Sequence, residues 1–196
     1  MVKGTYIVLG VLAAIALVLV GTVGAGVSAY NELNTQSQAV DAQAKNVDVI
    51  YQRNFDLLPK LEAIAKQYFA NETALQEQIA ALRSGIVTAQ NANLTVKSNV
   101  TEQLAGLVAV LGSRAENYPQ LKGDTLFITL QDETTNSANK LAAEKLRYND
   151  RAQSYNTLRS RCCFPLIVGN MLGFEKKEYI GYSDRPNQVA YPGSTL

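Results

Sequence analysis

The sequence predicts an all-α protein in which an N-terminal transmembrane helix is followed by an antiparallel up-and-down bundle of three to four long helices. Three observations predict this fold. The chain begins with an apolar, uncharged stretch, the later apolar residues recur at spacings of three and four, and no strand or hairpin pattern competes. We expect an anchor over residues 1–29, a helical bundle over 30–163, and an apolar capping segment with an irregular tail over 164–196.

The anchor is the stretch YIVLGVLAAIALVLVGTVGAGV, residues 6–27, which lies in an uncharged run between Lys3 and Glu32. A helix needs about 20 apolar residues to cross a hydrocarbon core ~30 Å thick. The alternative is a secretory signal peptide cleaved after Ala29, but the apolar region of such a peptide runs for only about 7–15 residues. We therefore favour a retained anchor, with the lipid bilayer as the first partner.

The charges that flank the anchor predict its orientation. Lys3 precedes the anchor, whereas the first charged residues after it are Glu32 and Asp41. Because basic residues stay on the inner side, we expect the N-terminus inside and the C-terminal domain in a periplasmic, extracellular, lumenal or virion-type compartment. The glycines at 21, 24 and 26 either offer a surface for another helix or reflect the ordinary tolerance of membrane helices for glycine.

The amino-acid composition argues against two classes of function, nucleic-acid binding and catalysis. With a formal net charge of +1 and 18% charged residues, the chain does not have the composition of a nucleic-acid binder. It contains no histidine, the commonest general base near neutral pH and the commonest metal ligand. No nucleophile–base pair, metal set or phosphate loop is recognisable, and Asp132 and Glu133 are adjacent and so lie on different helix faces. We expect no enzyme activity and no cofactor.

The first helix of the bundle is expected to continue from the anchor, because residues 28–67 contain no glycine and a single proline, Pro59. Pro59 should kink or loosen it, since proline lacks a backbone donor. The helix has one apolar face. Its members are Leu33, Val40, Ala44, Val47, Tyr51, Leu58, Leu61, Ala65 and Tyr68.

A second helical region follows a turn near residues 71–73, and it ends at Tyr118 because the residue before Pro119 disfavours helix. Gly85 and the polar run 90–93 are possible breaks, so the region forms either one helix or two. A third helix runs to about Leu158 with Asp124 as its N-cap. Residues 164–174 can cap the bundle, touch a membrane or bind a partner, and we favour capping because large exposed apolar patches are uncommon.

Three ordered motifs carry a family resemblance. Residues 51–61, YQRNFDLLPKL, resemble a Q-R-R-x-D-L-I-P-N-L signature and are followed by QYFANE at 67–72. Residues 116–122 read ENYPQLK, followed by Phe127 and by Leu130 with Gln131. Residues 147–150 read RYND, followed by YNT at 155–157 and by Phe164 with Pro165. With the anchor, these motifs resemble the LemA family of membrane-anchored helical proteins over residues 1 to about 180.

The resemblance implies the anchored helical fold and a membrane location, and it does not define a biochemical activity. Three positions depart from the family pattern: Asn54 replaces the second arginine of the pair, Ala138 replaces a glutamate, and Asn71 replaces a histidine. Any site that used those residues is altered here. The adjacent cysteines, Cys162 and Cys163, are also unusual, and an intersubunit link, a lipid-modified or buried thiol, and two inert cysteines all remain open.

Two groups of motif residues are candidate sites. Arg53 and Asp56 lie three apart beside Pro59, and we favour a polar cluster that holds the kink against a neighbouring helix over a ligand site. The second group lies near the end of the third helix, where we expect the tyrosine rings to fill the core with their hydroxyls at its edge, rather than to form an aromatic ligand box. This group comprises Arg147, Tyr148, Asn149, Tyr155 and Asn156.

Glycosylation sequons start at Asn71, Asn93 and Asn99, in the part of the chain expected outside the membrane. Their use requires a eukaryotic, archaeal or viral setting. Our main functional expectation is a non-enzymatic membrane-anchored scaffold or adaptor that self-associates or binds protein partners in a membrane-bounded assembly. The alternative is a sensor ectodomain that binds a ligand or peptide and signals through a partner.

Overall fold

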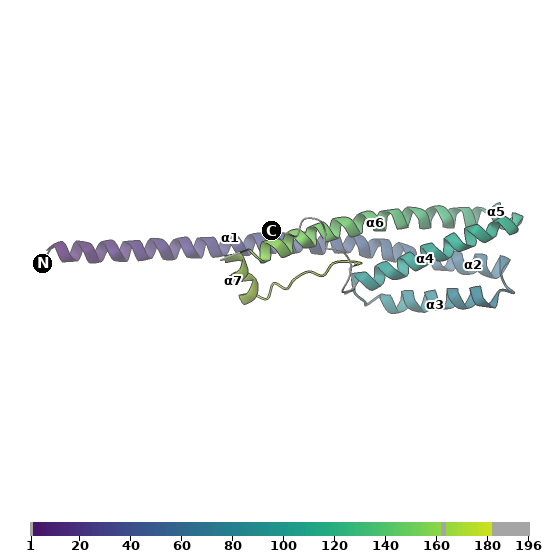
Figure 1. The fold of residues 1–196 in the computed structure, drawn as a ribbon, viewed down its shortest axis with the longest axis horizontal. Coiled ribbons are helices and arrows are strands. Elements are labelled where there is room, and N and C mark those ends of the chain that lie inside the picture. Colours follow the sequence, from purple (N-terminus) through teal and green to yellow (C-terminus); the bar gives the residue numbers. More distant parts are fainter. Residues whose placement is uncertain (1, 162–163, 182–196) are drawn as a thin grey trace, which may run out of the picture. The chain divides into compact units, whose positions relative to one another are not determined.

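The computed structural model describes residues 2–161 and 164–181, and their side chains from residue 9 onward (Figure 1). The described residues form helices and contain no strand, which confirms the all-α fold. The elements are α1 (Val2–Phe55), α2 (Leu58–Tyr68), α3 (Thr73–Ala89), α4 (Leu94–Arg114), the 3₁₀ helix η1 (Ala115–Asn117), α5 (Pro119–Lys122), α6 (Thr125–Arg159) and α7 (Phe164–Met171). Cys162, Cys163 and the expected irregular tail beyond residue 181 lie outside the described residues.

The chain divides into two compact units, which we describe separately. The first unit combines the chain up to Asp41 with Asp150–Glu178, and the second combines Ala42–Asn149 with the chain from Tyr179. Helices α1 and α6 therefore contribute residues to both units.

In the first unit, α1 changes character along its length. Residues 9–24 are exposed on every side, with Leu17 74% exposed, and only from Ala29 onward does α1 bury side chains. Among the described residues, this is the one helix long and apolar enough to cross a membrane, with a mean hydropathy of 2.3 over its best window. Beyond the exposed stretch, Leu33 and Val40 are buried, as are Ala152 and Tyr155 of α6.

In the second unit, α1 ends where Pro59 requires it to end. Helix α1 stops at Phe55, and α2 starts at Leu58 with Pro59 in its first turn. Proline lacks an N–H and its ring clashes with the carbonyl four residues earlier, so a straight continuous helix is strongly disfavoured here. The bend buries Leu57 and Leu58, and the predicted kink is therefore a complete break between two helices.

The second helical region forms two helices, and it breaks at residues 90–93 rather than at Gly85, which lies inside α3. The side chain of Asn93 caps α4 by accepting a hydrogen bond from the Val96 N–H at 3.0 Å. Helices α3 and α4 lie side by side and bury matching apolar stripes (Figure 1). These stripes are Leu75, Ile79, Leu82, Ile86 and Ala89 on α3, and Val100, Leu104, Val108 and Leu111 on α4.

Helix α6 runs antiparallel to α1 and α2 in the second unit. The Gln43 amide donates to the Glu144 carboxylate, and further along the chain Lys60 Nζ lies 2.7 Å from Glu133 Oε2. Residue numbers rise from 43 to 60 along α1 and α2, while those of their partners on α6 fall from 144 to 133. Asp124 is the predicted N-cap of α6, and its Oδ1 accepts from the Leu126 N–H at 2.7 Å.

Helix α7 differs from the expected cap. Its apolar side chains at Leu166, Ile167 and Met171 are exposed, as is Leu172 just after it. Of the α7 residues, only Gly169 is buried. The physical reason is that α7 is short and packs against Arg159 of α6 through Gly169. Glycine has no side chain, so the backbone makes this contact and the apolar side chains do not.

The core of the second unit contains buried polar atoms without a hydrogen-bond partner among the described residues. Thr134 Oγ1 and Ser137 Oγ on α6 are two of them. An unpaired buried hydroxyl costs about 1–3 kcal/mol. Thr134→Val removes the hydroxyl and keeps the shape, so we expect the free energy of unfolding to rise by about 1 kcal/mol. Denaturant unfolding in detergent, followed by circular dichroism, measures this change.

Thr101→Val is the matched control. Thr101 is a buried threonine of α4 whose Oγ1 donates to the Lys97 carbonyl oxygen at 2.9 Å. Losing this bond should lower the free energy of unfolding by about 1 kcal/mol. Equal destabilisation by both substitutions would contradict the unpaired state of Thr134.

A second prediction concerns pH. The Tyr68 hydroxyl donates to Asp124 Oδ2 at 2.6 Å, and this bond is the main reason that the pKa of Asp124 is lowered from 3.8. A carboxylate with a lowered pKa stabilises the fold above its unfolded pKa, and this contribution is lost as the pH falls through the folded pKa. We expect Tyr68→Phe to destabilise the protein at neutral pH, and the difference from wild type to shrink below about pH 4. A difference that stays constant in urea titrations across this range would refute the coupling.

Candidate functional site

The candidate site is built where α6 side chains hold the backbone of the segment that follows α7. Helix α7 ends in a left-handed glycine, Gly173, with φ +71°, and the Phe174 N–H donates to the Gly169 carbonyl at 3.0 Å. This is a Schellman-type helix end, in which glycine avoids the clash that a Cβ would cause. Residues 174–180 then continue without regular structure, so their backbone groups need partners from elsewhere.

In the first unit, Asn156 supplies two of these partners. Its Nδ2 donates to the Lys177 carbonyl oxygen at 2.9 Å, and its Oδ1 accepts from the Lys177 N–H at 2.9 Å. A carboxamide is the side chain group that can donate and accept side by side, so it reproduces the pair of bonds that a neighbouring β-strand would give. We call Asn156 and its bonds to Lys177 the Asn156 clamp.

Two neighbours of Asn156 on α6 extend the hold. The Tyr155 hydroxyl donates to the Glu175 carbonyl oxygen at 2.9 Å, and Arg159 Nε donates to the Phe174 carbonyl oxygen. Burial raises the pKa of Tyr155 from 10.0, so its hydroxyl keeps its proton for this bond at neutral pH. Three α6 side chains within little more than one turn thus bind three backbone positions of the segment.

The Lys177 side chain ties the clamp to α1. Its Nζ lies 2.7 Å from Asp41 Oδ1 and 5.9 Å from the centroid of the Tyr155 ring. Asp41 is the more exposed partner of this ion pair, so the pair contributes at most about 1 kcal/mol to stability. Its main effect is to fix the direction of the Lys177 side chain while Asn156 holds its backbone.

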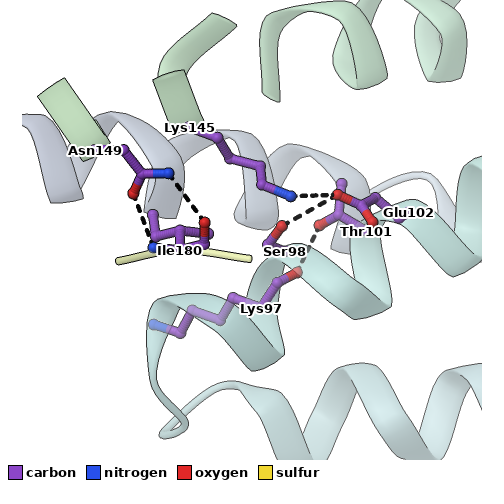
Figure 2. A network of polar contacts seen from close by, with 7 residues as sticks. All are labelled: Lys97, Ser98, Thr101, Glu102, Lys145, Asn149 and Ile180. Atoms are coloured by element: carbon purple, nitrogen blue, oxygen red, sulfur yellow. Dashed lines mark hydrogen bonds and ion pairs between the residues drawn. The ribbon is translucent and has the colours of Figure 1, made fainter. Parts of the chain in front are cut away.

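The second unit contains a matching contact, which Figure 2 shows. Asn149 Nδ2 donates to the Ile180 carbonyl oxygen at 3.1 Å, and Asn149 Oδ1 accepts from the Ile180 N–H at 2.9 Å. The Ile180 side chain is buried. We call this contact the Asn149 clamp.

A polar network lies beside the Asn149 clamp (Figure 2). Glu102 Oε1 accepts from Lys145 Nζ at 2.7 Å and from the Ser98 hydroxyl at 3.3 Å. Glu102, Lys145, Asn149 and Ile180 share the lining of an open hollow of about 570 Å³. The Lys145 ammonium is paired with Glu102, and both polar atoms of the Asn149 amide are paired with the Ile180 backbone.

Both clamps bind the backbone of the segment after α7 and not its side chains. In each clamp, one asparagine of α6 binds the N–H and the carbonyl of one residue. The arrangement can hold an extended peptide segment of almost any sequence. Among the described residues, no group of three or more Asp, Glu, Cys or His side chains converges as a metal site would require.

The structure brings together only part of the second group of candidate residues predicted from the sequence. Tyr148 and Tyr155 are both buried, whereas Arg147 is exposed and pairs with Glu144 at 2.5 Å. The sequence placed Asn149 and Asn156 on the right helix but gave no sign of their backbone bonds. The contribution of Arg159 was missed entirely.

The first group does not come together. Arg53, Asp56 and Pro59 are all exposed, and no ion pair joins Arg53 to Asp56 within the described part of the chain. The buried polar side chain of the bend is Asn54, whose Nδ2 donates to the Ile50 carbonyl oxygen at 3.0 Å. A shorter amide fits this buried place, where an arginine would have to bury its charge.

The three sequon asparagines, Asn71, Asn93 and Asn99, are all exposed. Their exposure meets the steric requirement for glycosylation, and the use of the sequons stays a prediction. Asn93 also serves as the cap of α4 through its side-chain oxygen.

Comparison with known proteins decides the family. The family model of the LemA family matches residues 43–190. The chain belongs to the LemA family. Among curated proteins, none matches it. Both clamps lie inside the LemA region, whereas the exposed apolar stretch of α1 precedes it.

The clamps of this LemA protein lead to a prediction. Asn156→Ala removes both bonds to Lys177, each worth about 0.5–1.5 kcal/mol. We therefore expect amide hydrogen exchange at Lys177 to accelerate by about tenfold. Exchange read by mass spectrometry on the detergent-solubilised chain measures this. Asn139→Ala, at an exposed asparagine of α6, is the matched control and should leave the exchange unchanged. Equal exchange in both variants would show that the clamp does not hold the segment.

Proposed function

We propose that this protein is a non-enzymatic, single-pass membrane-anchored helical scaffold or adaptor that forms a structural part of a larger membrane-associated assembly. One observation carries the proposal: α1 exposes apolar side chains on every side over residues 9–24 and then buries a single stripe. The first part has the surface of a lipid-spanning helix, and the second has the surface of a helix in a water-soluble domain.

The anchor has a physical basis in the exposed side chains. Leu17, Val18 and Val20 are each more than half exposed. Moving a side chain of this size out of water contributes about 1.5–3 kcal/mol, so a full span of them stabilises insertion strongly. On the charge pattern around residues 3–41, the N-terminus lies inside and the helical domain outside.

The shape of the helices supports the proposed scaffold role. The fold consists of long helices with scattered exposed apolar residues, including Val87, Val110 and Leu146. Scattered apolar residues of this kind are common on protein surfaces, so the support comes from the length of helices such as the 35-residue α6, which can contact protein partners or further copies of the chain along their sides. A Cβ added to Gly21 or Gly24 would meet no atom within 4 Å, which leaves room for a second helix to approach the anchor.

A second candidate function is a sensor ectodomain that binds an extended peptide and signals through a partner. The Asn156 clamp favours it, because the clamp binds backbone and could accept another peptide in place of residues 174–177. In that case a ligand would compete with the chain's own segment.

Membrane extraction tests the anchor. We expect the full-length protein to stay in the membrane pellet after urea and alkaline washes. We expect Leu17→Arg with Val20→Arg to release a measurable share into the supernatant, because each charge costs about 2.5–3.5 kcal/mol near the centre of a span. Val110→Arg with Leu146→Arg is the matched control and should stay in the pellet. Full release of the unmodified protein by the washes would refute the anchor.

Crosslinking followed by mass spectrometry in the native membrane separates the two roles. Abundant crosslinks to further copies or to a fixed set of proteins support the scaffold. A ligand that changes amide exchange at Lys177, without such crosslinks, supports the sensor instead.

A further inference from the structure

The apolar side of α7 has no partner within the described residues of the first unit. Ile167 is 53% exposed and Met171 is 79% exposed, and these residues lie four apart, on one face of the helix. Leu166 on one flank of this face and Leu172, just after the helix, on the other are exposed as well. We call these four residues the α7 apolar face.

The opposite side of α7 is held firmly. Gly169 is buried, and a Cβ at this position would lie 3.2 Å from Arg159 Cγ. Arg159 Nη2 also donates to Asn170 Oδ1 at 2.9 Å. Because α6 holds α7 on the side of Gly169, Ile167 and Met171 point away from α6.

An aromatic contact joins the segment just after α7 to α1 near the end of the anchor. The rings of Tyr30 and Phe174 pack edge to face with centroids 5.7 Å apart. Phe174 follows α7 by three residues. Tyr30 lies three residues beyond Val27, which is about 4.5 Å along α1. The headgroup region is about 5–8 Å thick on each side of the hydrocarbon core, so Tyr30 lies within it when residues 9–27 span that core.

We propose that the α7 apolar face lies in the headgroup region of the bilayer that α1 spans, as an interfacial helix whose partner is the lipid surface. This inference rests on the proposed membrane anchor. Tyrosine is favoured at this depth, and an eight-residue helix that exposes Ile167 and Met171 on one face can lie in the plane of the interface.

The charges around α7 indicate which class of lipid headgroup its binding requires. Arg161 and Lys176 are exposed and positive, whereas Glu175 and Glu178 are exposed and negative. These four charges cancel, Lys177 is paired with Asp41, and the half-buried Arg159 is bonded to Phe174 and Asn170. The contact therefore depends on apolar burial and does not require anionic lipid. Vesicles of zwitterionic phosphatidylcholine are therefore the right probe.

The sequence offers a clean spectroscopic test because it contains no tryptophan. A single tryptophan is introduced into the full chain by Ile167→Trp, and the protein is reconstituted into phosphatidylcholine vesicles. One set of vesicles carries bromine on the acyl chains near the headgroups, and a second set carries it deep in the hydrocarbon core. Bromine quenches only tryptophans that contact lipid. Two control variants carry their tryptophan on α1. Val18→Trp lies in the middle of the span, and Gln38→Trp is exposed about 16 Å beyond Val27.

The expected result is quenching of Ile167→Trp about threefold above that of Gln38→Trp, together with strong quenching of Val18→Trp by deeply placed bromine. If Val18→Trp is quenched and Ile167→Trp behaves like Gln38→Trp, α7 does not touch lipid and the inference fails while the anchor stands. A blue-shifted but unquenched Ile167→Trp would mean that a second copy covers the face, which also overturns it. Absence of quenching in Val18→Trp would refute the anchor itself. Unchanged amide exchange at Lys177 shows that the Ile167→Trp variant keeps its fold.

Discussion

The need to bury apolar surface along one helix governs the structure. Helix α1 has apolar side chains all around it over residues 9–24, then buries a single stripe that includes Leu33, Val40 and Val47. The stripe demands helical partners, which α6 and the shorter helices provide. The exposed stretch finds no such partners among the described residues, so its apolar surface is left for a different surrounding. Hydrophobic burial thus explains both the bundle and the need for an environment outside it.

Backbone hydrogen bonding imposes a second constraint, on the segment after α7. Residues 174–180 form neither helix nor strand, yet Lys177 and Ile180 each have both backbone groups paired with an asparagine side chain. The carboxamides of Asn149 and Asn156 replace the neighbouring strand that the segment lacks. A helix can therefore hold an extended chain beside it without any sheet. The tyrosine at 155 and the arginine at 159 complete this arrangement at two further carbonyl groups.

Local patterns in the sequence predicted the helices well, and they predicted the site only in part. Proline at 59, the polar run at 90–93 and Asp124 mark helix boundaries through backbone chemistry that acts within a few residues. The clamps join residues 21 and 31 positions apart, and no periodicity carries that information. The exposure of α7 also escaped prediction, because an apolar stretch indicates burial in general but not whether protein or another medium covers it. Arg53 and Asp56 attracted attention as charged neighbours, while the less conspicuous Asn54 is the buried one.

Because the clamps recognise only main-chain atoms, the attachment of the segment does not depend on which side chains it carries. Replacing Glu175, Lys176 or Glu178 leaves every clamp bond in place, so this part of the surface can drift in evolution or be redesigned while its course stays constant. Proline at 177 or 180 is the exception, since it alone lacks the N–H that each asparagine oxygen accepts. Residues 174–180 thus form a loop whose position is set by α6 and whose side chains can change without loss of that position.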